Sequence, residues 1–306
     1  MRRTSIGGTE VESTVLGLGT ADIFASPTRR SRARLIDAAL DAGIRHFDVA
    51  PMYGLGAAEA ELGRLLARRG DTVVATKFGI EPTLVAHTLR PIQAPLQRMR
   101  RPSTAKDPRA GRGGSALYAA PGYTGPVARR TLERSLRRLR RDRIDLFFLH
   151  DPGPGTPVSD DVRAALEDAQ RRGEVGAWGA AGEPAAVAAA KETLGGVPVS
   201  QVRSDVLSGS AQADIAFGIL GRALPALRAH LQQDARAAAW SETLDVDVLA
   251  ADAIQALLLQ EALARADVVL VGSRDPAHVA ALALAADAAT PARVDRFRQL
   301  VAEALG

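Results

Sequence analysis

The fold is decided by residues 44–77, IRHFDVAPMYGLGAAEAELGRLLARRGDTVVATK. This stretch contains a short apolar run, IRHFD (44–48), then an amphipathic segment of helical length, and then a second apolar run, TVVATK (72–77). The apolar runs have the length and the composition of buried strands. A strand, a helix and a second strand in this order are typical of a parallel sheet.

The same alternation extends in both directions along the chain. It gives eight apolar runs, which is the number that a closed (β/α)8 TIM barrel needs, whereas an open doubly wound sheet usually has fewer strands. A chain of 306 residues matches one barrel with insertions, so we expect a single domain over residues 1–306. Ahead of the barrel, residues 2–13 predict a small β-hairpin that turns at Gly7–Gly8. The other predicted strands are 15–19, 144–149, 175–179, 198–203, 213–218 and 268–272, and the predicted helices are 31–43, 58–70, 127–140, 159–172, 184–193, 247–265 and one from Pro276.

Two segments interrupt this alternation. Residues 79–126 have no periodic pattern and many Pro, Arg and Gly residues, and they follow the carboxyl end of the third strand. The active site of a barrel lies at that end, so we expect this long loop to fold over the barrel mouth and line the substrate pocket. The alternative is a mobile surface insertion, which the same composition would also permit. Between strands six and seven, residues 204–212 leave room for one helical turn or none.

Composition removes several classes of function. The chain has no cysteine, which excludes disulfides, thiolate metal sites and a cysteine nucleophile, and we predict no metal site. No apolar run approaches the roughly 18 residues of a membrane span, and the first residues lack the apolar region of a signal peptide. We therefore expect a soluble, cytoplasmic protein. The basic runs at 29–34 and 137–143 are interpreted as solvated helix faces, because no nucleic-acid-binding module accompanies them.

Four polar residues lie at or just beyond the carboxyl ends of strands two, three and four. Asp48 ends the second strand, Tyr53 follows five residues later, Lys77 ends the third strand and His150 follows the fourth. A barrel brings these strand ends together at one mouth. Lys77 also stands out because only three of the 39 basic residues are lysines.

The chemistry of these four residues is coherent. A free tyrosine hydroxyl has a pKa of about 10, and a lysine ammonium beside it would lower that pKa by favouring the phenolate. Asp48 would hold Lys77 charged and oriented, and His150 would donate a hydrogen bond to a substrate oxygen. The set suits protonation of the oxyanion that forms when a hydride reaches a carbonyl carbon. Taken singly, each residue also has a structural interpretation: an ion pair for Asp48 and Lys77, a rim aromatic for Tyr53 and a capped loop residue for His150.

The sequence resembles the aldo-keto reductase family from about Leu16 to Leu284. The resemblance lies in LGLGT (16–20), FDVAPMYGLGAAEAELG (47–63), TK (76–77) and IDLFFLH (144–150). It implies that Tyr53 is the general acid, that Lys77 and Asp48 tune it, and that His150 orients the substrate carbonyl. It also implies a nicotinamide cofactor and reduction of a small-molecule aldehyde or ketone.

On the cofactor side, the resemblance implies that Gln201 bonds the nicotinamide carboxamide and that Phe217, where the family usually has tyrosine, stacks on the nicotinamide ring. The stretch Gly272–Arg274 opens the last predicted helix and resembles the site for the adenosine phosphate. Helix N-termini favour anions and arginine favours phosphate, so NADP is expected rather than NAD. The cofactor residues expected in this way are Gly19, Thr20, Asp48, Gln201, Phe217, Ile219, Leu220, Gly272, Ser273, Arg274 and His278.

Three places depart from the family pattern. Ala181–Gly182 stands where the family commonly has Ser-Asn to hold the carboxamide, His278 stands where it has a second phosphate-binding arginine, and Ala281–Leu282 stands where it has Glu-Asn near the adenine. These changes reduce the number of expected contacts with the cofactor. Phe24, Tyr118, Tyr123 and Trp178 are the predicted substrate-binding residues.

The leading hypothesis is an NADP-dependent reductase of aldehydes or ketones. An alternative with the same site is a dehydrogenase of an aldose or a pyridoxal-type aldehyde, whose branch the segment DVAPMYGLGAAE (48–59) resembles. A third possibility, of a different class, is a regulatory subunit that binds cofactor with little turnover. No nucleic-acid or membrane partner is expected.

Overall fold

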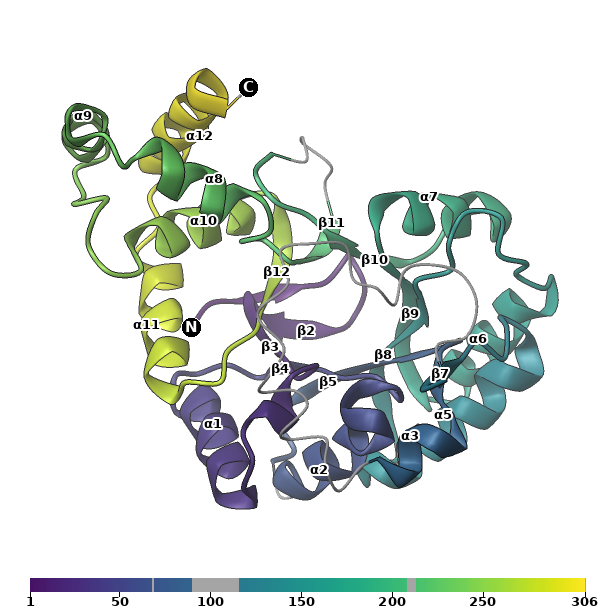
Figure 1. Ribbon diagram of the computed structural model, residues 1–306. Coiled ribbons are helices and arrows are strands. Elements are labelled where there is room, and N and C mark those ends of the chain that lie inside the picture. Colours follow the sequence, from purple (N-terminus) through teal and green to yellow (C-terminus); the bar gives the residue numbers. More distant parts are fainter. Residues whose placement is uncertain (68, 90–115, 208–212, 306) are drawn as a thin grey trace.

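The computed structural model describes residues 1–67, 69–89, 116–207 and 213–305. Eight parallel strands form a closed barrel surrounded by helices (Figure 1). This confirms the predicted (β/α)8 barrel. In order around the barrel, the strands are β3 (Leu16–Gly19), β4 (His46–Asp48), β5 (Val73–Phe78), β8 (Ile144–His150), β9 (Val175–Gly182), β10 (Val199–Arg203), β11 (Ala213–Phe217) and β12 (Ala266–Val271).

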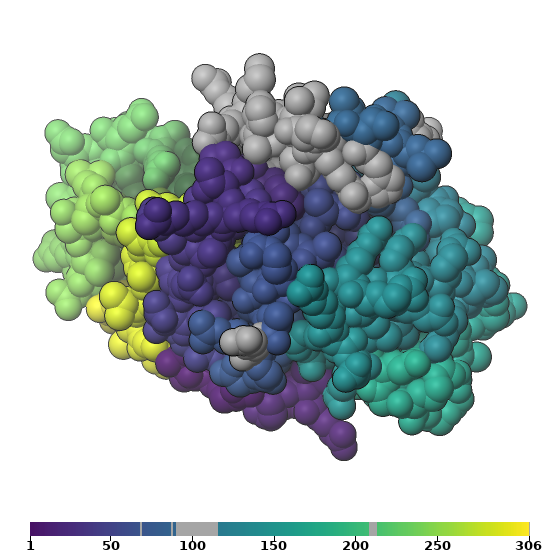
Figure 2. Space-filling model, turned by 90° about the horizontal axis from the view of Figure 1, so that it is seen from below, coloured from purple at the N-terminus to yellow at the C-terminus, as the bar shows by residue number. Residues whose placement is uncertain are grey.

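The outer ring of helices follows the predicted alternation through the first six strands. The helix α1 packs against α11, and α2 packs against α5. Figure 2 shows that N-terminal residues, in purple, lie beside C-terminal residues, in yellow. Three short elements, the 3-10 turns η1 (Ile23–Ala25) and η2 (Tyr53–Gly56) and the helix α3 (Leu84–Thr88), lie in the loops after β3, β4 and β5. The ring helices up to β10 are α1 (Arg29–Asp41), α2 (Ala58–Leu65), α5 (Gly125–Leu139), α6 (Asp161–Arg171) and α7 (Pro184–Thr193).

The C-terminal half has more helices than the sequence predicted. The single helix expected at 247–265 is shorter, and two helices that were not predicted precede it. Their apolar residues are largely alanines, which gives a weak periodic signal. Two helices rather than one follow the last strand. Figure 1 shows α8, α9, α10 and α12 grouped on one side of the barrel, and these four helices share a separate hydrophobic cluster. The elements are α8 (Ala223–His230), α9 (Asp234–Leu244), α10 (Ala253–Leu263), α11 (Pro276–Asp287) and α12 (Pro291–Leu305), with α11 outside the shared cluster.

The predicted N-terminal hairpin is confirmed and has a clear position. Strands β1 (Arg3–Ser5) and β2 (Glu12–Thr14) pair in an antiparallel manner. The turn between them places Ile6 and Val11 against the first inward-facing residues of the barrel strands, and both side chains are buried. The hairpin therefore closes the N-terminal end of the barrel, and the opposite end, where the strands finish, remains as the mouth.

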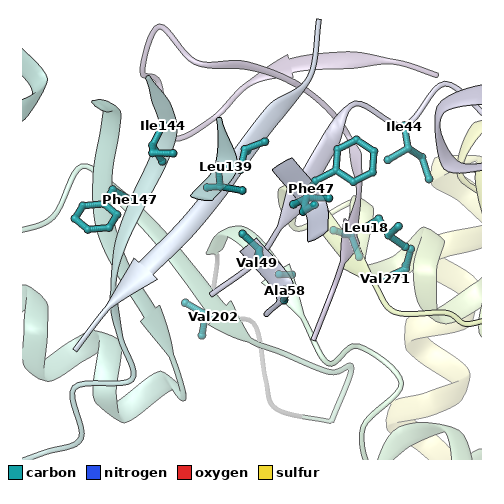
Figure 3. Packing of buried hydrophobic residues seen from close by; sticks show 14 of the residues in the cluster. Leu18, Ile44, Phe47, Val49, Ala58, Leu139, Ile144, Phe147, Val202 and Val271 are labelled. Carbon is teal, nitrogen blue, oxygen red and sulfur yellow. The ribbon is translucent and has the colours of Figure 1, made fainter. Parts of the chain in front are cut away.

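Side chains alternate between two packing layers along each barrel strand. On β4, Phe47 points outward into the large cluster beneath the helices, whereas His46 and Asp48 point into the barrel. Figure 3 shows Phe47, Phe147 and Val202 of the outer cluster, each on a different strand. The inner layer is filled by Ala75, Leu146, Phe148 and other apolar residues. Polar side chains are therefore concentrated toward the mouth.

Only part of the predicted long loop is described. Strand β6 (Glu81–Pro82) pairs with β7 (Tyr118–Ala119), and Glu81 forms an ion pair with Arg134 on α5. This small sheet anchors both ends of the loop beside the barrel. Residues 90–115 lie outside the described residues, so the prediction that the loop lines the pocket stays a prediction there. The same is true of residues 208–212 in the segment between β10 and β11, where the described residues 204–207 contain no helix.

Within the described ranges, no helix is both long enough and apolar enough to cross a membrane. Among those same residues, no group of three or more acidic or histidine side chains could hold a metal ion.

Candidate active site

A pocket of about 570 Å³ opens at the carboxyl ends of the barrel strands. Its wall includes all four residues predicted from the strand ends, which come from β4, the loop that follows it, β5 and β8. The pocket continues to the N-terminus of α11 on the other side of the mouth. The structure thus places the predicted catalytic and phosphate-binding regions in one cavity.

The centre of the pocket is a buried ion pair between Lys77 and Asp48. The Lys77 Nζ donates to both Asp48 carboxylate oxygens, at 2.8 and 2.6 Å, and to the backbone oxygen of Val49 at 3.1 Å. Burial alone would lower the pKa of Lys77, but the charge of Asp48, followed by interaction with Tyr53, raises it above its ordinary value. Lys77 therefore remains an ammonium in spite of its burial.

A neutral histidine lies beneath this pair. His46 shares β4 with Asp48, and its Nδ1 lies 2.9 Å from the Ser13 hydroxyl. Burial, and then the charge of Lys77, lowers the pKa of His46 to about 3. His46 therefore adds no positive charge beneath Lys77 at neutral pH.

The backbone after β4 turns Tyr53 back over the ion pair. Tyr53 starts η2, in which Gly54 and Leu55 have left-handed φ values of 57° and 51°. Such a conformation is uncommon for leucine and requires support from its surroundings. The Tyr53 ring centre lies 5.2 Å from the Lys77 Nζ and 5.9 Å from the centre of the His150 ring, in an edge-to-face arrangement. The strained turn thus brings the phenol close to both the ammonium and the imidazole.

Tyr123 supports His150 from outside the pocket. It is buried against Phe78, and its hydroxyl donates to the backbone oxygen of His150. Burial, and then the charge of Asp151, raises the pKa of Tyr123, so its hydroxyl stays protonated and remains a donor. Its position therefore fits a supporting role and does not support the predicted contact with substrate.

On the cofactor side, Gln201 points from β10 toward Asp48. Its Nε2 donates to Asp48 Oδ2 at 3.1 Å, while its buried Oε1 has no hydrogen-bond partner among the described residues. Thr20 also supports Asp48, because its hydroxyl donates to the Asp48 backbone oxygen at 2.7 Å. Gly19 and Phe217 complete this side of the pocket wall.

The start of α11 forms the far end of the pocket. Asp275 caps this helix by accepting a bond from the Ala277 backbone N–H at 2.9 Å. Gly272, Ser273, Arg274 and His278 all line the pocket, and the Ser273 Oγ lies 3.4 Å from His278 Nδ1. The Arg274 side chain is exposed and makes no ion pair within the part of the chain that the structure describes.

Several predicted residues do not reach the pocket wall. Trp178 lies on β9 between inward-facing residues, so it points outward, and the guanidinium of Arg163 covers its ring at 5.2 Å. Phe24 is buried, and the guanidinium carbon of Arg32 lies 4.7 Å from the centre of the Phe24 ring. Tyr118 is part of the small sheet beside the loop. Ile219 and Leu220, predicted to contact cofactor, instead pack in hydrophobic clusters. These positions do not support their predicted contacts.

The pocket also contains charged residues that the sequence analysis did not assign. Asp151 follows β8, Glu183 follows β9 and Arg203 ends β10. The Arg203 Nε donates to Glu183 Oε1 at 2.6 Å, and its guanidinium lies 5.0 Å from the centre of the Phe217 ring. The sequence carried a partial signal: Asp151 lies two positions beyond a predicted strand end and Arg203 is the last residue of one, whereas Glu183 lies four positions beyond the predicted end of its strand.

Comparison with known proteins agrees with this geometry. The family model described as "Aldo/keto reductase family" matches residues 15–207. A D-threo-aldose 1-dehydrogenase from a Pseudomonas species is 36% identical over 142 residues, which are 45% of this chain and 40% of that protein. A pyridoxal 4-dehydrogenase from Microbacterium luteolum is 32% identical over 157 residues, which are 49% of this chain and 43% of that protein. The matched regions thus span less than half the length of these two relatives.

Solved structures share the fold across nearly the whole chain. An aldo-keto reductase from Bacillus halodurans in its holo form has a TM-score of 0.69 and 20% identity, with 98% of this chain and 96% of that chain covered. A glycerol dehydrogenase from Gluconobacter oxydans has a TM-score of 0.68 and 22% identity, with 99% and 96% covered. With the family model matching well over half of its residues, the chain belongs to the aldo/keto reductase family.

Proposed function

We propose that this protein is an NADP(H)-dependent oxidoreductase that interconverts an aldehyde or ketone with the corresponding alcohol. The observation that carries the proposal is the buried Lys77–Asp48 pair beside Tyr53 in the wall of the large pocket. Burying a charged pair is costly, so a buried pair is weak evidence for a stabilising role in the barrel. A charge held next to a phenol is useful when that phenol transfers a proton.

The pocket fits a nicotinamide cofactor. The buried Oε1 of Gln201 has no hydrogen-bond partner within the described ranges and is an acceptor suited to the amide N–H of a carboxamide, and the Phe217 ring offers an apolar face. At the other end, the N-terminus of α11 with Ser273 and Arg274 suits a phosphate. When bound, such a cofactor donates the hydride in reduction and accepts it in oxidation.

The protein's own residues then handle the proton. In the reductive direction, Tyr53 gives its hydroxyl proton to the carbonyl oxygen of the substrate, and the positive charge of Lys77 stabilises the phenolate that remains. Asp48 keeps Lys77 charged and fixed, and His150 donates a hydrogen bond that orients the same carbonyl oxygen. In the oxidative direction the tyrosinate accepts the proton from the alcohol.

The names of the relatives favour a second version of this function. Both of the relatives described above are dehydrogenases, one of an aldose and one of pyridoxal. We therefore propose that the protein oxidises an aldose or a pyridoxal-type compound with NADP as its physiological reaction. This direction should be tested beside reduction.

The function can be tested by following NADPH absorbance in both directions. We expect NADPH consumption with small aldehydes and NADP⁺ reduction with either an aldose or a pyridoxal-type substrate. Tight NADPH binding without turnover in either direction, across a broad panel of carbonyl compounds and sugars, would favour a regulatory cofactor-binding subunit and contradict the enzymatic proposal.

Preference for NADP is expected to depend on Arg274. The change Arg274→Ala should weaken NADPH binding by about 1.5–3 kcal/mol, the usual size of a hydrogen bond to a charged group, and leave NADH binding nearly unchanged. Fluorescence titration of both cofactors measures this difference. Arg296→Ala, at an exposed arginine on α12 outside the pocket wall, is the matched control and should change neither affinity. Equal weakening of NADPH and NADH by Arg274→Ala would show that Arg274 does not meet the 2′-phosphate.

A further inference from the structure

Asp151 has an unusual position between the ends of β8 and β9. Its backbone is left-handed, with φ 53°, and its N–H donates to the Ala181 oxygen at 2.6 Å. Its Oδ1 accepts the backbone N–H of Glu183 at 3.2 Å. These two bonds, one from the backbone and one to the side chain, fix the carboxylate against the end of β9 and in the wall of the pocket.

The Asp151 carboxylate occupies the space where residue 182 would carry a side chain. A Cβ added to Gly182 would lie 2.4 Å from Asp151 Oδ1 and 2.9 Å from Asp151 Cα. Because the second contact is with backbone, rotation of the aspartate side chain could not relieve it. A side chain at position 182 would therefore be incompatible with the present position of Asp151. The Asp151 carboxylate takes the place in the pocket that a side chain at position 182 would otherwise occupy.

Strand register places this carboxylate on the same side of the pocket as Gln201. His150 on β8 pairs with Ala181 on β9, and Ala181 in turn pairs with Gln201 on β10. Asp151 is the next residue after His150, so it lies just above this row at the mouth. The Gln201 Oε1, which has no hydrogen-bond partner among the described residues, and the Asp151 carboxylate are thus two acceptors on β10 and after β8, the two strands that flank β9. A primary amide has two N–H bonds to donate, and two acceptors at one end of a pocket suit such a group.

We propose that Asp151 is a cofactor-binding residue: its carboxylate accepts an N–H of the nicotinamide carboxamide, and its negative charge favours the oxidised cofactor over the reduced one. The reason lies in the charge of the ring, because oxidised nicotinamide is a cation and reduced nicotinamide is neutral. A hydrogen bond to the carboxamide is available in both states, whereas Coulomb attraction acts only on the oxidised state. Asp151 therefore biases the bound cofactor toward the form that accepts hydride, which suits a dehydrogenase. This inference rests on the proposed use of a nicotinamide cofactor.

The test compares the dissociation constants of NADP⁺ and NADPH in the wild type and in Asp151→Asn. Asparagine keeps the shape, keeps an acceptor oxygen for the Glu183 N–H, and tolerates the left-handed backbone. Loss of the second acceptor oxygen would weaken both cofactor forms alike, so a change in the ratio of the two affinities reports the lost charge. In Asp151→Asn we expect the dissociation constant of NADP⁺, divided by that of NADPH, to rise by about tenfold. The rise should come mainly from weaker NADP⁺ binding. Asp151→Ser, which also keeps an acceptor oxygen without charge, should give a ratio shifted in the same direction.

Asp22→Asn is the matched control. Asp22 also lines the pocket but follows β3, three strands away from β8 around the barrel, and its removal should leave the ratio within about twofold of the wild type. If the wild type binds neither cofactor form, the proposed function is wrong. If the wild type binds both forms, and the Asp151 variants bind them with an unchanged ratio or lose the two affinities equally, the inference is overturned while the proposed function stands.

Discussion

Tyr53→Phe is expected to reduce turnover by about 10²- to 10⁴-fold, which is the usual contribution of a general acid. The phenyl ring keeps the contacts that the Tyr53 ring makes with His150 and with Lys77, so the shape of the pocket should not change. The variant loses the hydroxyl, and with it the transferable proton and the hydrogen-bond interaction with Lys77. Steady-state kinetics with a saturating aldehyde and NADPH measure the loss, and NADPH titration should give an affinity close to that of the wild type.

Tyr123→Phe is the matched control for this variant. It removes a hydroxyl that donates to the backbone oxygen of His150 and that belongs to a residue outside the pocket wall. Loss of one such bond costs about 1 kcal/mol, so we expect less than a tenfold change in turnover. Turnover of Tyr53→Phe close to the wild-type value, or an equal loss in the two variants, would remove Tyr53 from the role of general acid.

The barrel could be predicted from sequence because its signal is repetitive. Each strand is a short apolar run, and each of the first helices has one apolar face. Because this pattern repeats, an error in the bounds of one predicted element does not change the predicted fold. The prediction was incomplete over residues 219–246, where α8 and α9 form. Their alanines supply little periodicity, and the helices are stabilised by burying Trp240 and Leu244 in a cluster with α10 and α12. Such long-range packing is not visible in a local pattern.

The predicted catalytic residues came together because they depend only on topology. Asp48, Lys77 and His150 are inward-facing residues at strand ends, and any closed barrel brings such positions to one mouth. The predicted substrate residues depended instead on the direction in which each side chain points. A one-residue shift along β9 separates the outward Trp178 from the inward Ala177. The position of Asp151 near a predicted strand end is visible in the sequence, but its contact with β9 is not, because that contact depends on a left-handed backbone and on the space at Gly182.

Lys77→Met should combine a loss of turnover with a loss of stability. Turnover is expected to decrease by about 10²- to 10⁴-fold, because an uncharged side chain cannot stabilise the Tyr53 phenolate. Asp48 would remain buried, with the hydrogen bond from Gln201 but without its counter-ion. Breaking a buried ion pair by removing one partner costs about 3–5 kcal/mol, so the variant should also unfold at a lower denaturant concentration.

The double variant Asp48→Asn/Lys77→Met separates these two effects. It removes both charges, and asparagine can still accept a hydrogen bond from Gln201, so most of the lost stability should return. Turnover should stay as low as in Lys77→Met, since the ammonium beside Tyr53 is still missing. Denaturant unfolding followed by circular dichroism measures stability, and steady-state kinetics measure turnover. If turnover returned together with stability, the pair would be a structural ion pair alone, and Tyr53 would act without a charged partner.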